Sequence, residues 1–344
     1  MNIVCIFADQ MHRYAMGCMN NPDVTTPNLD RLAREGVLFT NAYSNNPVCS
    51  PFRVHLMTGK YSRETDSLGN GCRVPKDCIT LPDQLNDADF ETSFVGKWHV
   101  GDKGNKPIPE ELRAGFRHFI GYQCYNGFQK DVCFYDEQNR EHRFDRHRTE
   151  VATDLALERL GRLAGSPFYL LVGYQAPHYP EQPLPEFEEM YRNAPVHHRP
   201  NYCEGVEPFT PTLSPPSPED RSFDPDNQRY GGDMDEYVRL YNAMVTQIDR
   251  GVGRLIDRLK ELGLYEDTAI VFTADHGDMQ GAHGLVNKCK PHEESAGIPL
   301  IASVPGQRDG RVVEAPVSGI DLYPTVLDLA GVQSQAKVSG ISVI

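Results

Sequence analysis

Short apolar runs that end in polar or charged side chains recur along this 344-residue chain. Continuous apolar runs of this kind are typical of strands buried in a parallel sheet. The runs, each with the polar residues that follow it, are Ile3 to Ala8 with Asp9 and Gln10, Phe94 to Val95 with Lys97 and His99, Phe168 to Val172 with His178, and Ala269 to Thr273 with Asp275 and His276. Because ligands bind at the carboxyl ends of strands in open α/β sheets, these polar residues are expected to converge on one edge.

Helix signals alternate with these strands. Thr26, Pro27 and Gly36 are typical of a helix that starts after a cap and stops at a glycine. Further helices are expected after Thr80 and over Thr149 to Leu163, Met234 to Leu262 and Ile320 to Leu329, and further strands over Val37 to Phe39 and Ile298 to Val304. The pattern predicts an α/β fold with a largely parallel sheet covered by helices on both faces.

Two stretches lack clear periodicity. Residues 102–148 are rich in glycine, aromatic and charged residues, and they are predicted to be loops over the ligand-binding face, where specificity usually resides. Residues 181–233 are rich in proline and are predicted to be a long insertion or a lid.

The run Cys49-Ser50-Pro51-Phe52-Arg53 reads as a nucleophile at the start of a helix that ends at Thr58-Gly59. Free backbone N–H groups, the helix dipole and Arg53 would favour a bound anion and lower the pKa of the thiol. The alternative is a small buried cysteine beside a surface arginine. Only the rest of the chain can decide between the two.

Composition limits the classes of partner. The net charge of −14 argues against nucleic acid and anionic membranes, so an anionic substrate would require positive charge concentrated locally. Nine cysteines form no C-x-x-C pair and are interpreted as mostly reduced, buried thiols. The chain shows no signal peptide and no apolar run long enough for a membrane span, which predicts a cytoplasmic protein, or a periplasmic or secreted one if a signal was removed.

The polar clusters together indicate a site for an anionic ester. Two carboxylates, an amide oxygen and an imidazole suit Ca²⁺, Mg²⁺ or Mn²⁺ better than structural zinc. The groups that would supply positive charge and proton transfer are Arg53, Lys97, Lys288, His99 and His178. Taken singly, each of these residues could equally be a turn, cap or surface residue.

At this point the chain resembles the type I, formylglycine-dependent sulfatases of the alkaline-phosphatase-like fold, from Ile3 to about Ile344. Five blocks carry the resemblance in the same order. They are C-x-P-x-R from Cys49 to Arg53 with Thr58-Gly59, Gly96-Lys97-Trp98-His99-Val100-Gly101, Pro177-His178, Thr273-Ala274-Asp275-His276-Gly277, and Lys288 followed by Glu293-Glu294.

The resemblance implies a role for each matched residue. Cys49 would be converted to Cα-formylglycine by a formylglycine-generating enzyme, and its hydrated form would attack sulfur. Arg53 would orient that diol, Lys97 would hold the sulfate oxygens, and His99 would take a proton when sulfate leaves. His178 and Lys288 would assist the leaving oxygen. The ligands of one divalent metal would be Asp9, Gln10, converted Cys49, Asp275 and His276, with Ca²⁺ favoured and Mn²⁺ or Mg²⁺ as alternatives.

Gln10 and His276 depart from many members of that family, which have aspartate and asparagine there. The Asp-Gln and Asp-His variant also resembles choline sulfatases and phosphonate or phosphate ester hydrolases. Members usually continue past a Gly-x-Ser segment, here Gly340-Ile341-Ser342, into a small antiparallel subdomain, which is expected to be absent. Residues 1–344 are therefore interpreted as one catalytic domain.

The expected function is hydrolysis of a sulfate ester, on a sulfated sugar or a small aryl or alkyl sulfate. One alternative is a phosphonate or phosphate mono- or diester hydrolase with the same site. The other is a non-catalytic sulfatase-like binding protein, which predicts an unmodified thiol at Cys49.

Overall fold

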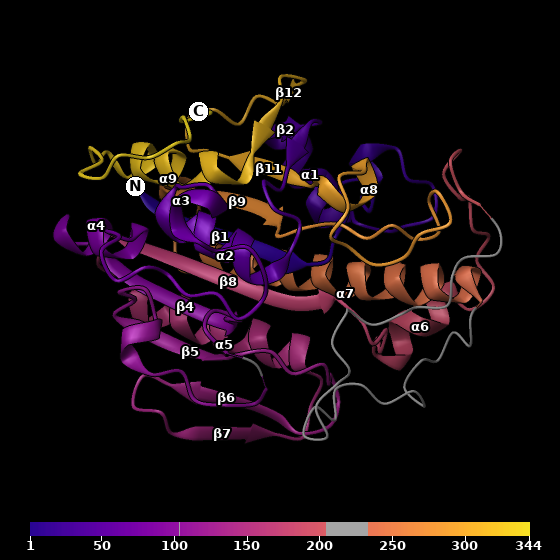
Figure 1. Ribbon diagram of the computed structural model, residues 1–344, viewed down its shortest axis with the longest axis horizontal. Coiled ribbons are helices and arrows are strands. Elements are labelled where there is room, and N and C mark those ends of the chain that lie inside the picture. Colours follow the sequence, from indigo (N-terminus) through magenta and orange to yellow (C-terminus); the bar gives the residue numbers. More distant parts are fainter. Residues whose placement is uncertain (103, 204–232) are drawn as a thin grey trace.

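The computed structural model describes residues 1–102, 104–203 and 233–344, and a ten-stranded sheet lies at its centre (Figure 1). From one edge to the other, the strands are β12 (Arg311–Val313), β2 (Val37–Phe39), β11 (Leu300–Ser303), β9 (Thr268–Ala274), β1 (Asn2–Asp9), β8 (Phe168–Pro177), β4 (Glu91–Lys97), β5 (His118–Tyr122), β6 (Val132–Asp136) and β7 (Glu141–Phe144).

The middle of the sheet is parallel. Strand β1 pairs in parallel with β9 on one side and β8 on the other, and β8 continues through parallel pairs to β4 and β5. Strands β8 and β9 are buried along their whole length, as continuous apolar runs between two helical layers should be. The predicted fold class is confirmed, with antiparallel strands added towards both edges.

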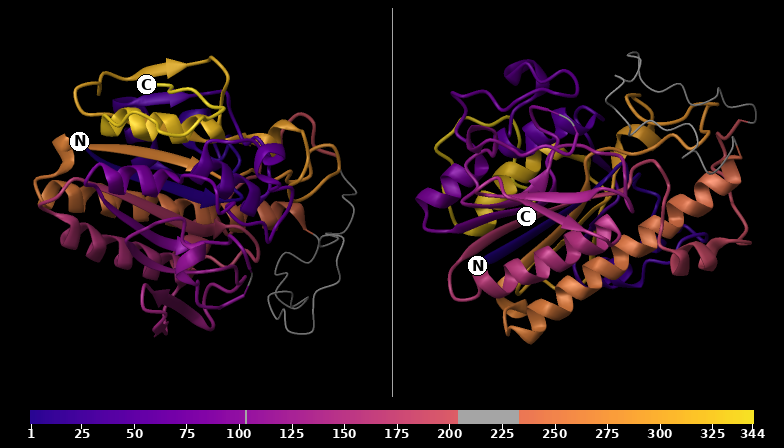
Figure 2. Two further views of the ribbon diagram at one scale, coloured as in Figure 1. Left: turned by 60° about the vertical axis from the view of Figure 1, so that its left-hand side comes forward. Right: turned by 90° about the horizontal axis from the view of Figure 1, so that it is seen from below.

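Helices cover both faces of the sheet (Figures 1 and 2). One face carries α1 (Pro27–Glu35), α5 (Arg148–Leu163) and α7 (Met234–Glu261), with α6 (Pro185–Tyr191) packed on α7. The other face carries α2 (Cys49–Thr58), α4 (Leu81–Asp87) and α9 (Leu322–Ala330). Smaller elements are the 3-10 turns η1 (Gly17–Met19), η2 (Glu110–Leu112), η4 (Tyr265–Asp267) and η5 (Gly319–Asp321), helices α3 (Ser62–Thr65) and α8 (Glu293–Ala296), and a second sheet of β10 (Gly297–Ile298), β3 (Ala42–Tyr43) and β13 (Val317–Ser318).

Local sequence signals set the helix ends. The hydroxyl of Thr80 accepts a hydrogen bond from the backbone of Asp83, whose side chain bonds back to Thr80 and completes a capping box at α4. Gly59 ends α2 with a φ of 63°, in the left-handed region that glycine enters without steric cost. The predicted stop of the nucleophile helix at Thr58-Gly59 is thus confirmed.

The prediction of loops over residues 102–148 was wrong, because this region contributes β5, β6 and β7 to the main sheet. These strands are only four or five residues long, too short for a periodic signal to stand out. The expectation of one continuous strand over Ile298 to Val304 is confirmed only for Leu300–Ser303, which is β11. Pro299 interrupts it, and β10 and β11 on either side belong to different sheets.

Of the predicted insertion 181–233, the structure describes 181–203 and 233, and residues 204–232 lie outside the described residues. The described part includes α6, whose Phe187 and Tyr191 are buried. All nine cysteines are free thiols, as expected, but only Cys5, Cys49 and Cys133 are buried, so the expectation of burial was wrong for the other six. No helix in the described ranges is both long and apolar enough to span a membrane.

Candidate active site

Four neighbouring strands deliver polar residues to one edge of the sheet. Asp9 ends β1, Lys97 ends β4, His178 follows β8, and Asp275 and His276 follow β9. The order β9-β1-β8-β4 brings these residues together although they are far apart in sequence. The predicted convergence is therefore confirmed.

A glycine just before Lys97 permits the close approach of β4 to β8. Gly96 has a φ of 124°, and a Cβ at this position would lie 2.0 Å from the carbonyl oxygen of Gly173 on the neighbouring strand. No larger residue could occupy this position without moving β4 away from β8. The buried approach of Lys97 to the sheet edge depends on this close contact.

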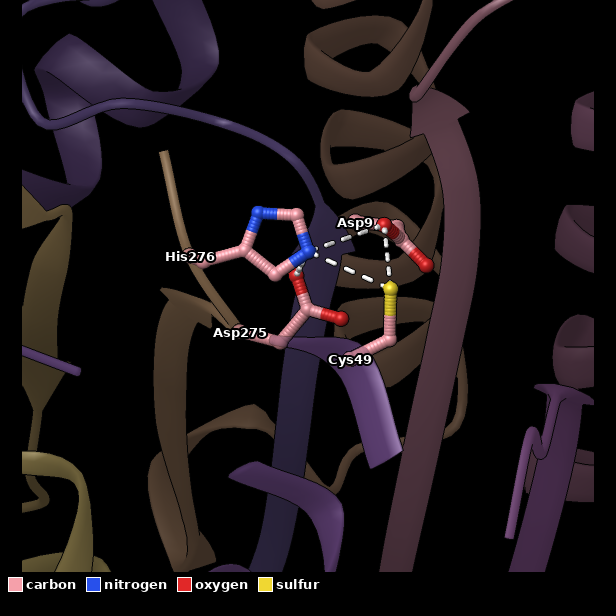
Figure 3. Close-up of side chains that lie close together, drawn as sticks. All are labelled: Asp9, Cys49, Asp275 and His276. Carbon is pink, nitrogen blue, oxygen red and sulfur yellow. Dashed lines mark hydrogen bonds and ion pairs between the residues drawn. The ribbon is translucent and has the colours of Figure 1, made fainter. Parts of the chain in front are cut away.

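Asp9, Cys49, Asp275 and His276 form a buried cluster whose potential ligand atoms lie within 4.8 Å of one another (Figure 3). His276 Nε2 lies 3.2 Å from Cys49 Sγ, 3.4 Å from Asp275 Oδ1 and 3.6 Å from Asp9 Oδ1. His276 Nδ1 donates a hydrogen bond to the Gly277 carbonyl, so the Nε2 lone pair faces the cluster. Burial lowers the pKa of His276 to about 4, which keeps the ring neutral.

This donor set fits a divalent cation. Two carboxylate oxygens and an imidazole lone pair face one another. The Gln10 backbone N–H donates to Asp275 Oδ1, but the proton of the Cys49 thiol can satisfy only one of Asp9 Oδ1 and His276 Nε2. Such acceptors repel one another unless a cation lies between them. Oxygen ligands with one nitrogen suit the hard cations expected from the sequence. Gln10 lies beside this cluster, where its Oε1 accepts a hydrogen bond from Lys288 Nζ.

Three buried cations surround the cluster. Arg53 Nη2 donates to Asp9 Oδ2 at 2.9 Å and to Asp275 Oδ2 at 3.0 Å. Lys97 Nζ lies 2.7 Å from Asp9 Oδ2. Lys288 Nζ donates to Gln10 Oε1 at 3.0 Å and to Cys49 Sγ at 3.3 Å.

These charges make the site electropositive within an acidic protein. Burial raises the pKa of Asp9, but Lys97 and the other nearby cations outweigh burial and hold that pKa well below its usual value. The carboxylates of Asp9 and Asp275 face three cations, and a divalent metal would add two more positive charges. The chain as a whole has a net charge of −14, so the site concentrates the positive charge that an anionic substrate needs.

The thiol of Cys49 behaves differently from the expectation. The helix dipole and Arg53 were expected to lower its pKa, but burial and the Asp9 charge raise the pKa of Cys49 to about 11. Cys49 does lie at the start of α2, as expected, and is completely buried. Burial therefore opposes the thiolate form of an unmodified Cys49.

An open cavity of about 1140 Å³ lies over the cluster and reaches Cys49, His99, His178 and Lys288. Burial, followed by nearby cations, lowers the pKa of both His99 and His178 well below the usual value. His178 Nδ1 donates to the Tyr179 carbonyl at 2.7 Å, so its Nε2 is the nitrogen left for chemistry. The rest of the wall includes neutral amide and aromatic residues, among them Asn45, Asn70, Asn126, Tyr43 and Tyr179.

The structure brings together all ten residues predicted from the sequence. They are Asp9, Gln10, Cys49, Arg53, Lys97, His99, His178, Asp275, His276 and Lys288, and all are buried. Sequence reasoning missed Asp278, Tyr237 and Glu181, which lie buried behind Gln10. Asp278 stands two residues after His276, and this proximity was the only available signal for it.

Comparisons with known proteins agree with this geometry. The sulfatase family model matches residues 1–332. The ulvan-active sulfatase of Formosa agariphila is 30% identical over 349 residues, which cover 98% of this chain and 63% of that protein. The solved structure of BT4656 in complex with its substrate D-glucosamine-2-N,6-O-disulfate has a TM-score of 0.84 at 26% identity, covering 99% of this chain and 79% of that one. The phosphonate monoester hydrolase of Silicibacter pomeroyi has a TM-score of 0.78 at 25% identity, covering 99% and 75%.

Fold and site together define an α/β protein of the alkaline-phosphatase-like fold with an electropositive centre at the carboxyl edge of its sheet. The chain belongs to the sulfatase family. It spans 63% of the length of the ulvan-active sulfatase that it matches.

Proposed function

We propose that the protein hydrolyses a sulfate ester carried by a saccharide, with a nucleophile made from Cys49 and one divalent metal. The observation that carries this proposal is the position of Cys49 Sγ, which lies in the donor cluster, 3.2 Å from His276 Nε2 and 3.3 Å from Lys288 Nζ. A residue in this place can share a metal with the carboxylates and face a substrate from the cavity floor.

Cys49 is the residue that conversion to Cα-formylglycine would change, by a formylglycine-generating enzyme. That group would supply an aldehyde hydrate as nucleophile in place of the protonated thiol. Asp9, Gln10, Asp275 and His276 would hold the metal, for which the oxygen-rich set favours Ca²⁺ over Mn²⁺ or Mg²⁺. The metal would stabilise negative charge on the ester.

The surrounding residues would orient the nucleophile, bind the sulfate and transfer protons. Arg53, fixed by both carboxylates, would orient the group at position 49, and Lys97 would meet the sulfate oxygens. His99, neutral because its pKa is lowered, can accept a proton. Burial lowers the pKa of Lys288, but the neighbouring acidic groups Cys49 and Asp9 raise it overall, so Lys288 stays charged beside the leaving oxygen. His178 would gain a proton only when sulfate raises its pKa.

The saccharide is proposed from the cavity and from the relatives. Amide and aromatic side chains on the cavity wall can hydrogen bond to and stack on a sugar ring. The names of the ulvan-active sulfatase and of the BT4656 complex both refer to sulfated carbohydrates.

We expect kcat/KM for a sulfated monosaccharide or 4-nitrophenyl sulfate to exceed that for the matched phosphodiester and phosphonate by about tenfold or more, equal to about 1.4 kcal/mol of barrier. Parallel assays of the metal-loaded protein measure this ratio. A phosphonate monoester turned over faster than every sulfate would favour the phosphonate hydrolase, which the Silicibacter pomeroyi neighbour makes the specific alternative.

Mass spectrometry of the peptide that contains Cys49 tests the nucleophile. We expect an aldehyde mass there when the protein is coexpressed with a formylglycine-generating enzyme, and an unchanged thiol mass at Cys72, which does not line the cavity. Turnover should rise in proportion to the converted fraction and be absent in Cys49→Ala. Full activity with an unconverted thiol would refute the nucleophile, and a thiol with no turnover in the native host would indicate a binding protein.

A further inference from the structure

Gln10 is held by hydrogen bonds at every polar atom. Its backbone N–H donates to Asp275 Oδ1 at 3.1 Å, and its carbonyl accepts from the Tyr241 hydroxyl at 2.8 Å. Its side-chain Nε2 donates to Asp278 Oδ2, and its Oε1 accepts from Lys288 Nζ. The residue has a φ of 67°, an unfavourable conformation for a side chain with a Cβ, so these contacts also hold the backbone.

The direction of this amide matters because its two ends have opposite chemistry. The oxygen can ligate a cation, whereas the NH₂ group cannot. Rotation of the amide by half a turn would present the NH₂ group to Lys288 and to the metal cluster. The two orientations have nearly the same shape, so only the neighbouring hydrogen-bonding groups can select between them.

Two neighbours make this selection: Lys288, whose ammonium group can only donate, and, at the other end of the amide, Asp278. Its Oδ2 accepts hydrogen bonds from Gln10 Nε2 at 2.5 Å and from the Tyr237 hydroxyl at 2.6 Å, and its Oδ1 accepts from the backbone of Gln280 at 3.0 Å. A carboxylate held by three donors offers Gln10 only acceptor atoms. Asp278 is completely buried, so water cannot replace it in this role.

We propose that Asp278, held by Tyr237, is a positioning residue that turns the Oε1 atom of Gln10 towards a hard divalent cation. The inference rests on the proposed metal centre. Residues 10 and 278 then form a matched pair, in which an amide at position 10 requires a carboxylate at position 278. A carboxylate at position 10 has an oxygen at both ends, so either orientation could ligate the cation. It would require an amide at position 278, because two buried carboxylates in contact repel each other.

A reciprocal exchange tests this pairing. Four proteins are compared by calorimetric titration with Ca²⁺ and with Mn²⁺ and by the shift in melting temperature on metal addition: wild type, Asp278→Asn, Gln10→Glu, and the double variant. We expect Asp278→Asn to weaken metal binding by about 10- to 100-fold, as loss of an outer partner of a ligand does. Gln10→Glu alone should also bind weakly, and the double variant should recover binding to within about tenfold of wild type.

The outcomes separate the two proposals. Wild-type protein that binds neither ion refutes the metal centre itself, which is the proposed function. The pairing is refuted if wild type binds metal and Asp278→Asn binds it equally well. It is also refuted if the loss of metal-binding free energy in the double variant equals the sum of the losses in the two single variants. A purely structural role for Asp278 would lower the metal-free melting temperature of both single variants without reciprocal recovery of metal binding.

If Asp278→Asn fails to fold, Tyr237→Phe provides the second test. It removes one donor from Asp278, together with the hydrogen bond between Tyr237 and Glu181, and leaves the Asp278 carboxylate in place. We expect this variant to bind metal several-fold more weakly than wild type. Its melting temperature without metal should match that of wild type, so that lost stability does not explain the weaker binding. Unchanged metal binding in Tyr237→Phe would refute the support that Tyr237 gives to Asp278.

Discussion

Replacing Asp9 by asparagine is expected to lower metal binding by at least about 100-fold, turnover by about 1000-fold or more, and the free energy of unfolding by about 3 to 5 kcal/mol. These losses are expected to be large because the Asp9 carboxylate both belongs to the metal cluster and pairs with two buried cations. Asp9 Oδ1 belongs to the metal cluster, and Asp9 Oδ2 lies within 2.9 Å of Arg53 Nη2 and 2.7 Å of Lys97 Nζ. The Lys97 side chain is completely buried, so without Asp9 its charge would have no close counter-ion among the described residues.

A second substitution separates stability from function. Lys97→Met in the Asp9→Asn background removes the charge left unpaired, and we expect it to recover most of the lost free energy of unfolding while turnover stays absent. Urea denaturation in the presence of a chelator measures stability without the metal. Asp275→Asn is the matched comparison, because it also removes a carboxylate from the cluster but leaves the Asp9–Lys97 pair intact. Equal stability losses in the two aspartate variants would contradict this assignment.

Much of this site could be predicted from the sequence because parallel strands impose a simple geometry. Asp9, Lys97, His178 and Asp275 each stand at the end of an apolar run, and the carboxyl ends of neighbouring parallel strands meet at one edge. The order in which the strands lie cannot be read from such runs. It happens that β9, β1, β8 and β4 are direct neighbours, and this adjacency makes the four residues a single cluster.

The sequence could not show how burial would change the pKa of a side chain. The local features of Cys49, a helix start and a nearby arginine, argue for a low pKa, whereas the folded protein raises that pKa to about 11. The larger influences are the loss of water and the charge of Asp9, which stands forty positions away in sequence. A local pattern therefore located the residue correctly and gave the wrong sign for its acidity.

Residues that act through others were also missed. Asp278 lies next to a motif that was recognised, but its partner Gln10 is 268 positions away and Tyr237 comes from the first turn of α7. Strands β5, β6 and β7, at one side of the sheet, were missed for a related reason, since pairing with neighbours defines them more than their own short sequences do. Long-range pairing of this kind leaves little trace in one sequence.

Glu181 leads to a prediction about stability that is independent of metal and substrate. Its side chain is 2% exposed, and its Oε1 has no hydrogen-bond partner among the described residues. Burial, with a smaller contribution from the charge of Asp278, raises the pKa of Glu181 from 4.5 to about 8. The folded protein therefore holds a proton between these two pH values that the unfolded chain releases.

The sign follows from this difference in bound protons. The stabilisation from Glu181 is fully present below about pH 4.5 and is lost as pH rises through about 8. Glu181→Gln keeps the shape and has no charge to bury, so its free energy of unfolding should exceed that of wild type by on the order of 3 to 5 kcal/mol at pH 9, with a difference near zero at pH 4.

Urea denaturation of both proteins from pH 4 to pH 9 measures that difference, and subtraction removes every other titrating group that the two share. Glu189→Gln is the control, because Glu189 belongs to α6 in the same segment and its side chain is 62% exposed. A surface glutamate gains almost nothing from neutralisation, so its difference from wild type should stay within about 0.5 kcal/mol across the range. If Glu181→Gln shows the same flat difference, Glu181 is ionised in the folded protein at neutral pH, and a buried cation or water must accompany it.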